Sequence, residues 1–391
     1  MKKEKYLGWD PYDGLSGKIS GKFANKRILN IAVIQLNLYS PLNLRPFFGI
    51  QKGCANKALA LFSRGYLYLY AITDREEFKI EAKTLLKALE SQNISNSINK
   101  FSCASYYFPY IAPKHYLSHS LPDIICVTES LKSFLVAYEI LGKKKYFILA
   151  RKGMRFLLDE LLEKSNDTAY FKYTPEEKGK IVFNVSALAL ETISSFLKYS
   201  PDYTLIDIGE EAIKLLINHQ RDDGAWPYSL YADSGVYYWQ IDYHQGFIID
   251  GLVSFLPYIT EENLRNRTLE AIEKGVDFYM NRQFSPEGWS YYRYPIKYPI
   301  DIHNQAQGII TFSKLYKAFK NPKYLEFAEK IAGWTIKNMQ DPAGYFYAHR
   351  WLGFVNKIPY MRWAQAWMML ALATLISMGG QGNESSHGWA H

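Results

Sequence analysis

The stretch DYHQGFIIDGLVSFL, residues 242–256, indicates how this chain folds. Its apolar residues lie on every side of a helix, which is the pattern of a helix buried all round. A second stretch of the same kind, DIHNQAQGIITFSKL, follows at residues 301–315 and carries Asp and His at the same two positions. An interval of this length between like segments is typical of an architecture built from repeated helical units.

Apolar helical runs of this kind recur along the chain, beginning near positions 56, 127, 184, 243, 304 and 363. The intervals between them are nearly constant, apart from a longer one between the first two runs. Amphipathic, charged segments lie between or before the runs, at roughly 24–38, 75–92, 143–163, 204–219, 262–282 and 323–340. A helical hairpin cannot bury its apolar face alone, whereas six hairpins in a ring enclose a continuous core. The sequence therefore predicts an all-α fold, the (α/α)6 toroid.

We expect this toroid to be a single domain over residues 1–378, with a flexible C-terminal tail at 379–391. The longest interval, between the first two runs, predicts an insertion at Ser91–Pro122 that covers the mouth of the ring. In such a ring the inner helices begin at one end, so side chains in their first turns converge there on a common pocket.

Composition and charge limit the possible partners. The 391 residues carry a formal charge of +8, which favours an anionic partner. Lys and Arg are spread along the chain without a nucleic-acid motif, so we expect no nucleic acid. Aromatic residues make up 16% of the chain and often stand beside Gly and Pro, as in sugar-binding loops. No segment is apolar enough to span a bilayer, although peripheral membrane contact stays open.

The three cysteines are Cys54, Cys103 and Cys126, and they lack the CxxC spacing of zinc or redox sites. Reduced thiols and a cytoplasmic location are therefore expected. No cofactor is predicted, and a metal held by two Asp and two His ranks low because DxH on separate helices is not a dedicated ligand motif.

A second repeated element follows the outer helices. It reads Gln220-x3-Gly224-x-Trp226, Gln340-x3-Gly344-x-Phe346 and, as a variant, Gln283-x4-Gly288-Trp289. A Gly after a helix supplies a left-handed C-cap, so these turns serve structure first. The element resembles the repeat of terpenoid cyclases, but the acidic DxDD motif is absent and isoprenoid chemistry ranks below the alternatives.

Four longer segments resemble the six-hairpin glycosidase-like superfamily, and within it uncharacterised proteins associated with surface-polysaccharide biosynthesis. They are Gly8–Gly14 (GWDPYDG), Tyr243–Phe247 (YHQGF), Asp301–His303 (DIH) and Tyr360–Trp367 (YMRWAQAW). A weaker similarity, through Ala306-Gln307-Gly308, is to the helical domain of D-glucuronyl C5-epimerases. The resemblance implies the helical toroid and a carbohydrate substrate.

The strongest candidate site is the repeated DxH element. Asp242 and His244 recur as Asp301 and His303, and Arg362 follows His303 by the same interval again. Paired carboxylates suit glycosidic hydrolysis, whereas a base with a cation suits C5 proton removal from a uronate. The structural alternative is that both Asp residues cap helices and both His residues form hydrogen bonds to buried polar groups.

Further side chains near the same mouth are predicted to bind substrate. They are Asn184, Trp226, Tyr228, Trp239, Trp289, Tyr292 and Trp363, and His119 marks another approach to an inner helix. We therefore predict an enzyme acting on an oligo- or polysaccharide in surface-glycan metabolism, and we expect acidic units in that substrate. Glycoside hydrolysis ranks first, uronyl C5-epimerisation or polysaccharide lysis second, and a non-catalytic glycan-binding or scaffold protein is the rival class.

Overall fold

The computed structural model describes residues 2–18, 27–40, 42–112, 115–117, 120–165 and 168–379. His119 and residues 380–391 of the predicted tail lie outside these ranges. Six apolar helices form an inner layer: α3 (Asn56–Thr73), α5 (Ile124–Leu141), α7 (Phe183–Leu197), α9 (His244–Phe255), α11 (Ile302–Phe319) and α13 (Trp367–Gly379). Each begins within about four residues of its predicted start, because the apolar runs that define these helices are buried on all sides.

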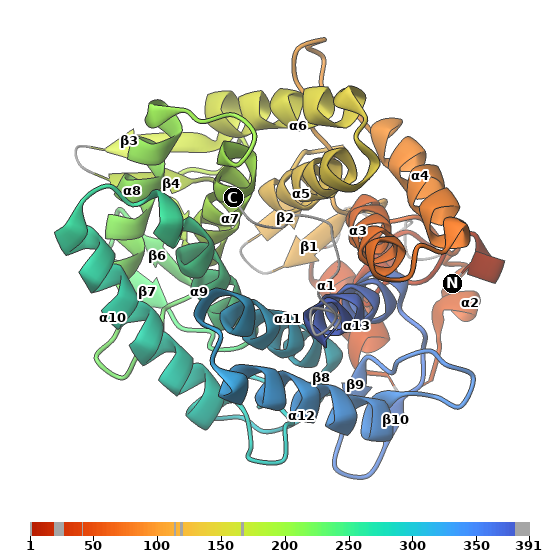
Figure 1. The fold of residues 1–391 in the computed structure, drawn as a ribbon. Helices are drawn as coiled ribbons and strands as arrows, with labels where there is room; N and C mark the ends of the chain where they lie inside the picture. The colour runs from red at the N-terminus through yellow and green to blue at the C-terminus, as the bar shows by residue number, and fades with distance from the viewer. Residues whose placement is uncertain are drawn as a thin grey trace.

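The inner helices form a closed ring, which Figure 1 shows nearly end-on. Each packs against the next in sequence, and α13 returns to pack against α3. One hydrophobic core runs through all six, with buried side chains such as Leu59, Phe134, Leu188, Ile249 and Ile309. The all-α toroid and its single domain are therefore as predicted.

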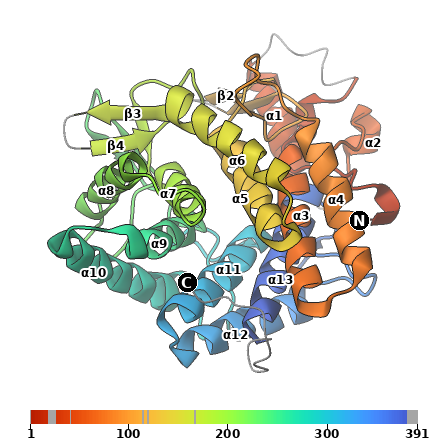
Figure 2. The ribbon, with the colours of Figure 1, turned by 45° about the horizontal axis from the view of Figure 1, so that its top comes forward.

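Five amphipathic helices pack outside this ring in the part of the chain that the structure describes. They are α4 (Glu76–Glu90), α6 (Lys144–Phe156), α8 (Tyr203–Asn218), α10 (Glu262–Phe278) and α12 (Pro322–Met339). The described part of the predicted segment 24–38 also forms a helix, α1 (Arg27–Tyr39). Its main contacts are with η2 (Asp13–Leu15) and β1 (Tyr110–Ala112) rather than with an inner helix. It departs from the predicted outer layer because its buried side faces the N-terminal segment. Figure 2 shows the same ring tilted, with α1 above α3 in that view.

The loops between the helices contain short antiparallel strands. They are β1 (Tyr110–Ala112) with β2 (His115–Leu117), β3 (Leu162–Ser165) with β4 (Thr168–Phe171), β5 (Lys180–Val182) with β6 (Ser229–Tyr231) and β7 (Val236–Tyr238), and β8 (Ile300–Asp301) with β9 (His349–Arg350) and β10 (Val355–Asn356). β5 and β8 lead directly into α7 and α11, so these strands fix where two inner helices begin. No helix among the described residues combines the length and hydropathy that crossing a bilayer requires.

Each repeated turn is held by a glutamine at the start of an inner helix or, for Gln365, in the helical turn that leads into one. Gln245 accepts from the backbone N–H of Trp226 at 2.8 Å and donates to its carbonyl at 2.9 Å, and Gln365 clasps Phe346 in the same way. Gln305 holds the turn around Gly288 and Ser290. These glutamines recur once in each of three successive repeats, and they fix the loops that surround the pocket to the helices that begin there.

A network of buried ion pairs crosses the ring below the pocket. Lys132 binds Glu129 at 2.8 Å and Glu191 at 2.7 Å, and Lys314 binds Glu191 and, at 2.7 Å, Asp250. These residues belong to α5, α7, α9 and α11, so the network joins four inner helices across the core. Buried charges are tolerated when each has a partner, as here.

Candidate active site

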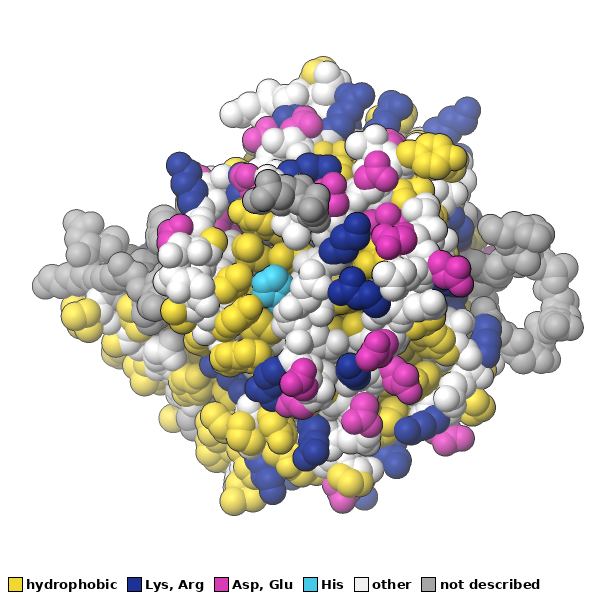
Figure 3. Space-filling model, turned by 90° about the vertical axis from the view of Figure 1, so that its left-hand side faces the viewer, with side chains coloured by type: hydrophobic (Ala, Val, Ile, Leu, Met, Phe, Trp, Pro, Cys, Tyr) yellow, Lys and Arg dark blue, Asp and Glu magenta, His cyan; other side chains and the backbone are white. Residues whose placement is uncertain are grey.

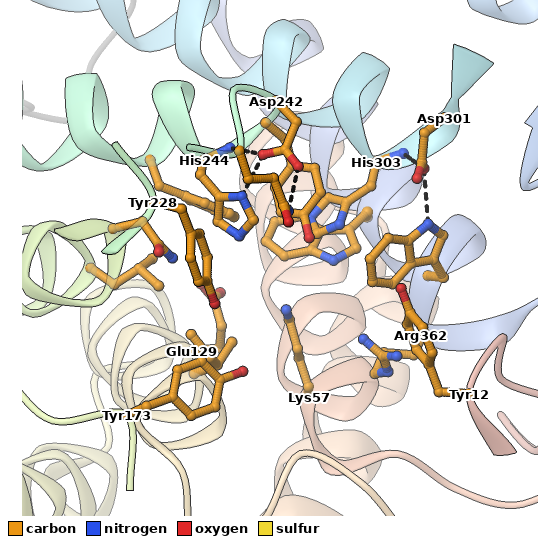
Figure 4. A pocket seen from close by; sticks show the side chains of 18 of the residues that line it. Tyr12, Lys57, Glu129, Tyr173, Tyr228, Asp242, His244, Asp301, His303 and Arg362 are labelled. Atoms are coloured by element: carbon orange, nitrogen blue, oxygen red, sulfur yellow. Dashed lines mark hydrogen bonds and ion pairs between the residues drawn. The ribbon is translucent and has the colours of Figure 1, made fainter. Parts of the chain in front are cut away.

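A cavity of about 250 Å³ lies at the end of the ring where the inner helices begin. Its walls come from the first turns of these helices and from the loops that lead into them (Figure 4). The five residues predicted to carry chemistry all line it: Asp242, His244, Asp301, His303 and Arg362. Tyr106, from the predicted insertion at 91–122, also lines the cavity, which places that insertion at the mouth.

Asp242 and His244 form a hydrogen-bonded pair at the start of α9. Asp242 Oδ1 accepts from the backbone N–H of His244 at 3.1 Å and from the ring Nδ1, while Oδ2 accepts from Gln240 at 2.7 Å. A carboxylate can only accept, so the proton of the neutral ring resides on Nδ1 and the lone pair on Nε2. His244 is therefore oriented for proton transfer at a cavity wall.

His303 lies in an aromatic sandwich. Its ring stacks on Tyr243 with a centroid distance of 3.9 Å and on Trp367 at 4.5 Å, and neither ring nitrogen has a hydrogen-bond partner among the described residues. Burial, reinforced by the charge of Lys57, holds the pKa of His303 well below its ordinary value. The ring is therefore neutral, with two unsatisfied nitrogens beside the cavity.

Asp301 has a largely structural environment. Its Oδ1 accepts from the backbone N–H of His303 and from the indole N–H of Trp363, both at 2.9 Å, which makes it the N-cap of α11. His349 Nε2 lies 3.4 Å from Oδ2. In both copies the Asp accepts from the backbone N–H of the His two residues later, but only Asp301 is the N-cap of its helix and only Asp242 also bonds the ring of its histidine. Among the described residues, no three His, Cys, Asp or Glu side chains are grouped closely enough to bind a metal.

Arg362 lies on the π-helical turn η7 (Met361–Ala366) that precedes α13. Asp10 binds its Nε at 2.6 Å and its Nη2 at 2.8 Å, and both residues are buried. The Asp10 carboxylate, acting against desolvation, raises the pKa of Arg362. The charge of Arg362 is therefore already compensated within the protein, by a residue of the Gly8–Gly14 segment.

Four of the seven predicted substrate-binding residues line the cavity: Asn184, Tyr228, Tyr292 and Trp363. Tyr228 lies edge-on to His244 with ring centroids 4.8 Å apart, and Trp363 lies edge-on to His303 at 4.8 Å. Tyr292 carries the guanidinium of Arg293 over its ring at 5.2 Å. Binding of substrate by these residues stays a prediction.

The other three predicted platforms lie outside the cavity lining. Trp226 is fully buried and donates its indole N–H to Leu216, because its turn is clasped into the core. Trp289 stacks on Tyr298. Trp239 follows β7 and is 43% exposed, with the guanidinium of Arg221 over its ring. Figure 3 shows that hydrophobic side chains gather among interspersed charges on the face of the molecule that it presents. An aromatic beside a loop glycine is therefore not enough to identify a cavity residue.

Sequence reasoning missed three cations of the cavity wall: Lys57, Lys180 and Arg293. None of them forms an ion pair with a described acidic side chain within 4 Å, in contrast to Arg362. Lys57 comes from α3, and burial together with the charge of Arg362 lowers its pKa from 10.5 to about 7. Nothing in their sequence spacing sets these residues apart, because each lies on a different repeat and no period relates them.

The closed ring of inner helices, with amphipathic helices packed outside it, is the (α/α)6 toroid that the sequence predicted. Several solved structures are similar to it. Cellobiose 2-epimerase from Bacillus thermoamylovorans B4167 is 13% identical with a TM-score of 0.64, over 83% of this chain and 88% of the epimerase. The α-1,6-mannanase of Salegentibacter sp. HEL1_6 is 11% identical with a TM-score of 0.63, over 85% of this chain and 90% of the mannanase.

An unsaturated glucuronyl hydrolase specific for heparin is 15% identical with a TM-score of 0.63, over 85% of this chain and 90% of the hydrolase. At this level of identity the likeness shows the fold, since one fold supports several chemistries. No sequence-defined protein family matches the chain, and no curated protein is similar to it in sequence.

Proposed function

We propose that this protein is a carbohydrate-active enzyme that removes a proton from carbon in an acidic sugar unit, as in uronyl C5-epimerisation or β-elimination. The observation that carries the proposal is the pair of Asp242 and His244, which presents an imidazole to a cavity whose other walls carry uncompensated cations. The similar solved structures include sugar epimerases and a glucuronyl hydrolase, which supports a carbohydrate substrate.

His244 is the proposed general base. Asp242 holds the ring in one orientation and stabilises the imidazolium that forms when Nε2 takes a proton. His303 is the second proposed proton-transfer group, because its neutral ring lacks partners among the described residues and would gain a hydrogen bond from a sugar hydroxyl.

Cationic side chains would make the carbon proton acidic enough to remove. Loss of a proton next to a carboxylate places negative charge on the carboxylate oxygens, and fixed positive charge in a water-poor cavity stabilises that charge. Lys57, Lys180 and Arg293 are available for this because no acidic partner neutralises them among the described residues. A neutral sugar would offer these three side chains no negative charge to bind.

The test is incubation of uronate-containing oligosaccharides in heavy water, followed by NMR and mass spectrometry. We expect deuterium at C5, or an unsaturated product with ultraviolet absorbance. His244→Ala should lower this rate by roughly 10²–10⁴-fold, the usual contribution of a general base. The matched control is His219→Ala, since His219 bonds the carbonyl of Leu215 outside the cavity lining and its loss should leave the rate unchanged. Absence of exchange and of elimination would contradict the proposal.

Glycoside hydrolysis is the second candidate. It is favoured by the presence of both Asp242 and Asp301 in one cavity, at the starts of neighbouring inner helices. It ranks lower because both carboxylates already accept several hydrogen bonds, whereas a hydrolase needs one of them to protonate the glycosidic oxygen. New reducing ends with neither deuterium at C5 nor an unsaturated product would establish hydrolysis in place of proton removal from carbon.

A further inference from the structure

Lys57 occupies a central position in the cavity. It is the second residue of α3, and its side chain points from the α3 wall toward His244 and His303 (Figure 4). It is only 6% exposed, and its ammonium lies 4.8 Å from the centre of the Trp367 ring. The burial is unusual, because a lysine is rarely enclosed without an acidic partner.

The glutamate of the cavity wall is already in use. Glu129 lines the same cavity, but Arg64 and Lys132 bind its two oxygens. Arg362, the cation beside Lys57, is bound by Asp10 on two nitrogens. Among the described residues, Lys57 therefore contacts the face of the Trp367 ring and forms no ion pair with an acidic side chain. The positive charge of Arg362 lies nearby.

We propose that Lys57 binds the carboxylate of the acidic sugar, and that its amine takes up a proton as the sugar binds. The identity of the ligand rests on the function proposed above. The bond formed is an ammonium–carboxylate ion pair, and the proton comes from solvent. Above about pH 7 the amine of Lys57 thereby gains its charge when an anion binds.

The surroundings of Lys57 support proton uptake at this residue. Arg362 keeps its charge throughout, since its pKa is raised, and it disfavours a second cation in the free protein. His303 stays neutral because burial lowers its pKa, and Cys126 stays a thiol because burial raises its pKa. Glu129 and Asp123 act in the opposite sense and favour a charged Lys57.

Two further observations limit what these acids can do. The pKa of Glu129 is lowered by its cations, against desolvation, so this acid remains ionised. Asp123 accepts bonds from Ser105 and from the backbone of Cys126, which hold its oxygens away from the role of a direct partner for Lys57. His244 also faces the cavity, so the experiment must assign any proton uptake to Lys57 rather than to this imidazole.

The pH dependence follows from the sign of the shift. With a pKa of about 7 in the free protein, about nine in ten Lys57 amines are neutral one pH unit above that value. A bound carboxylate raises this pKa toward that of an ordinary lysine. Affinity for an acidic sugar should therefore fall as the pH rises above about 7, by up to about tenfold per pH unit.

The experiment is isothermal titration calorimetry with methyl β-glucuronide and methyl β-glucoside at about pH 8, in two buffers whose ionisation enthalpies differ. The variants are Lys57→Met, which removes the charge, and Lys57→Arg, which makes it permanent. Lys83→Met is the control for net charge, because Lys83 is exposed on α4. The wild-type measurement alone tests proton uptake, so the result does not depend on the variants folding.

We expect the wild type and Lys83→Met to prefer the glucuronide and to take up close to one proton per site. Lys57→Met should bind the glucuronide roughly tenfold or more weakly, as expected when a desolvated charge pair is lost. Lys57→Arg should bind it without proton uptake. A preference for the glucuronide without proton uptake, or a preference that survives in Lys57→Met, would overturn the proposal for Lys57. Equal binding of both sugars would overturn it and leave the carbohydrate function standing, whereas binding of neither would remove both.

Discussion

Replacing Lys57 by Met should make this protein more stable near neutral pH. The buried amine has a pKa of about 7 in place of the ordinary 10.5. At about 1.4 kcal/mol per pH unit, that difference corresponds to roughly 5 kcal/mol of unfavourable free energy when the pH is below 7. Met keeps the length of the aliphatic chain against Trp367, and loss of the cation–π contact offsets at most about 2 kcal/mol of the gain. The expected net stabilisation is about 3 kcal/mol.

The sign of the pH dependence distinguishes this effect from ordinary repacking. Because the folded-state pKa is the lower one, the unfolded chain binds more protons between about pH 7 and pH 10.5, and the wild type gains stability as the pH rises through this range. Urea denaturation at about pH 6 and about pH 9 should therefore show a Lys57→Met advantage that shrinks at the higher pH. A variant that is less stable than the wild type at about pH 6, or whose advantage is the same at both pH values, would refute the reasoning. Lys83→Met, exposed on α4, should show no advantage at either pH.

Two further substitutions test how the site is held. Asp10→Asn leaves the buried guanidinium of Arg362 without its counter-ion. It should therefore lower the free energy of unfolding, measured by urea denaturation, by roughly 3–5 kcal/mol. A loss below about 1 kcal/mol would mean that solvent reaches Arg362. Gly224→Ala should destabilise more than Gly235→Ala, because both positions have positive φ but only at Gly224 would the new Cβ lie 2.2 Å from a backbone oxygen, that of Lys274. Equal melting temperatures for the two variants would contradict this.

The repeat was visible in the sequence because ring geometry imposes it. Each inner helix must be apolar on all sides, and each outer helix must be apolar on the side that faces the ring. The length of a helical hairpin sets the spacing between repeats. The period and the positions of the helices could therefore be predicted. The segment that became α1 has the same amphipathic character as an outer helix, and only its contacts with η2 show that it lies elsewhere.

The site was predictable only where it follows the same repeat. Asp242, His244, Asp301 and His303 stand at equivalent helix starts, and the cavity collects them for that reason. The difference between the two copies was not visible in the sequence. Asp242 bonds the ring of His244 and accepts from Gln240, which are near it in the chain, whereas Asp301 is contacted by Trp363 and His349 from distant segments. Lys57 was missed for a related reason. Lys57 matters because it has no acidic ion-pair partner among the described residues. The sequence does not show which side chains surround a residue in the fold.

The closure of the ring by α13 against α3 has a consequence for the timing of activity during synthesis. The buried pair of Asp10 and Arg362 joins positions at opposite ends of the sequence, and Lys57 finds the ring of Trp367 over a similar separation. At about 5–20 residues per second, a ribosome takes tens of seconds to pass from one member of each pair to the other. Until Trp367 has emerged, an unfinished chain can form its first hairpins but has neither the partner of Asp10 nor the aromatic wall behind Lys57. The sugar binding proposed above would therefore report the docking of the last inner helix, and a pulse-chase assay of binding would time the completion of the whole ring.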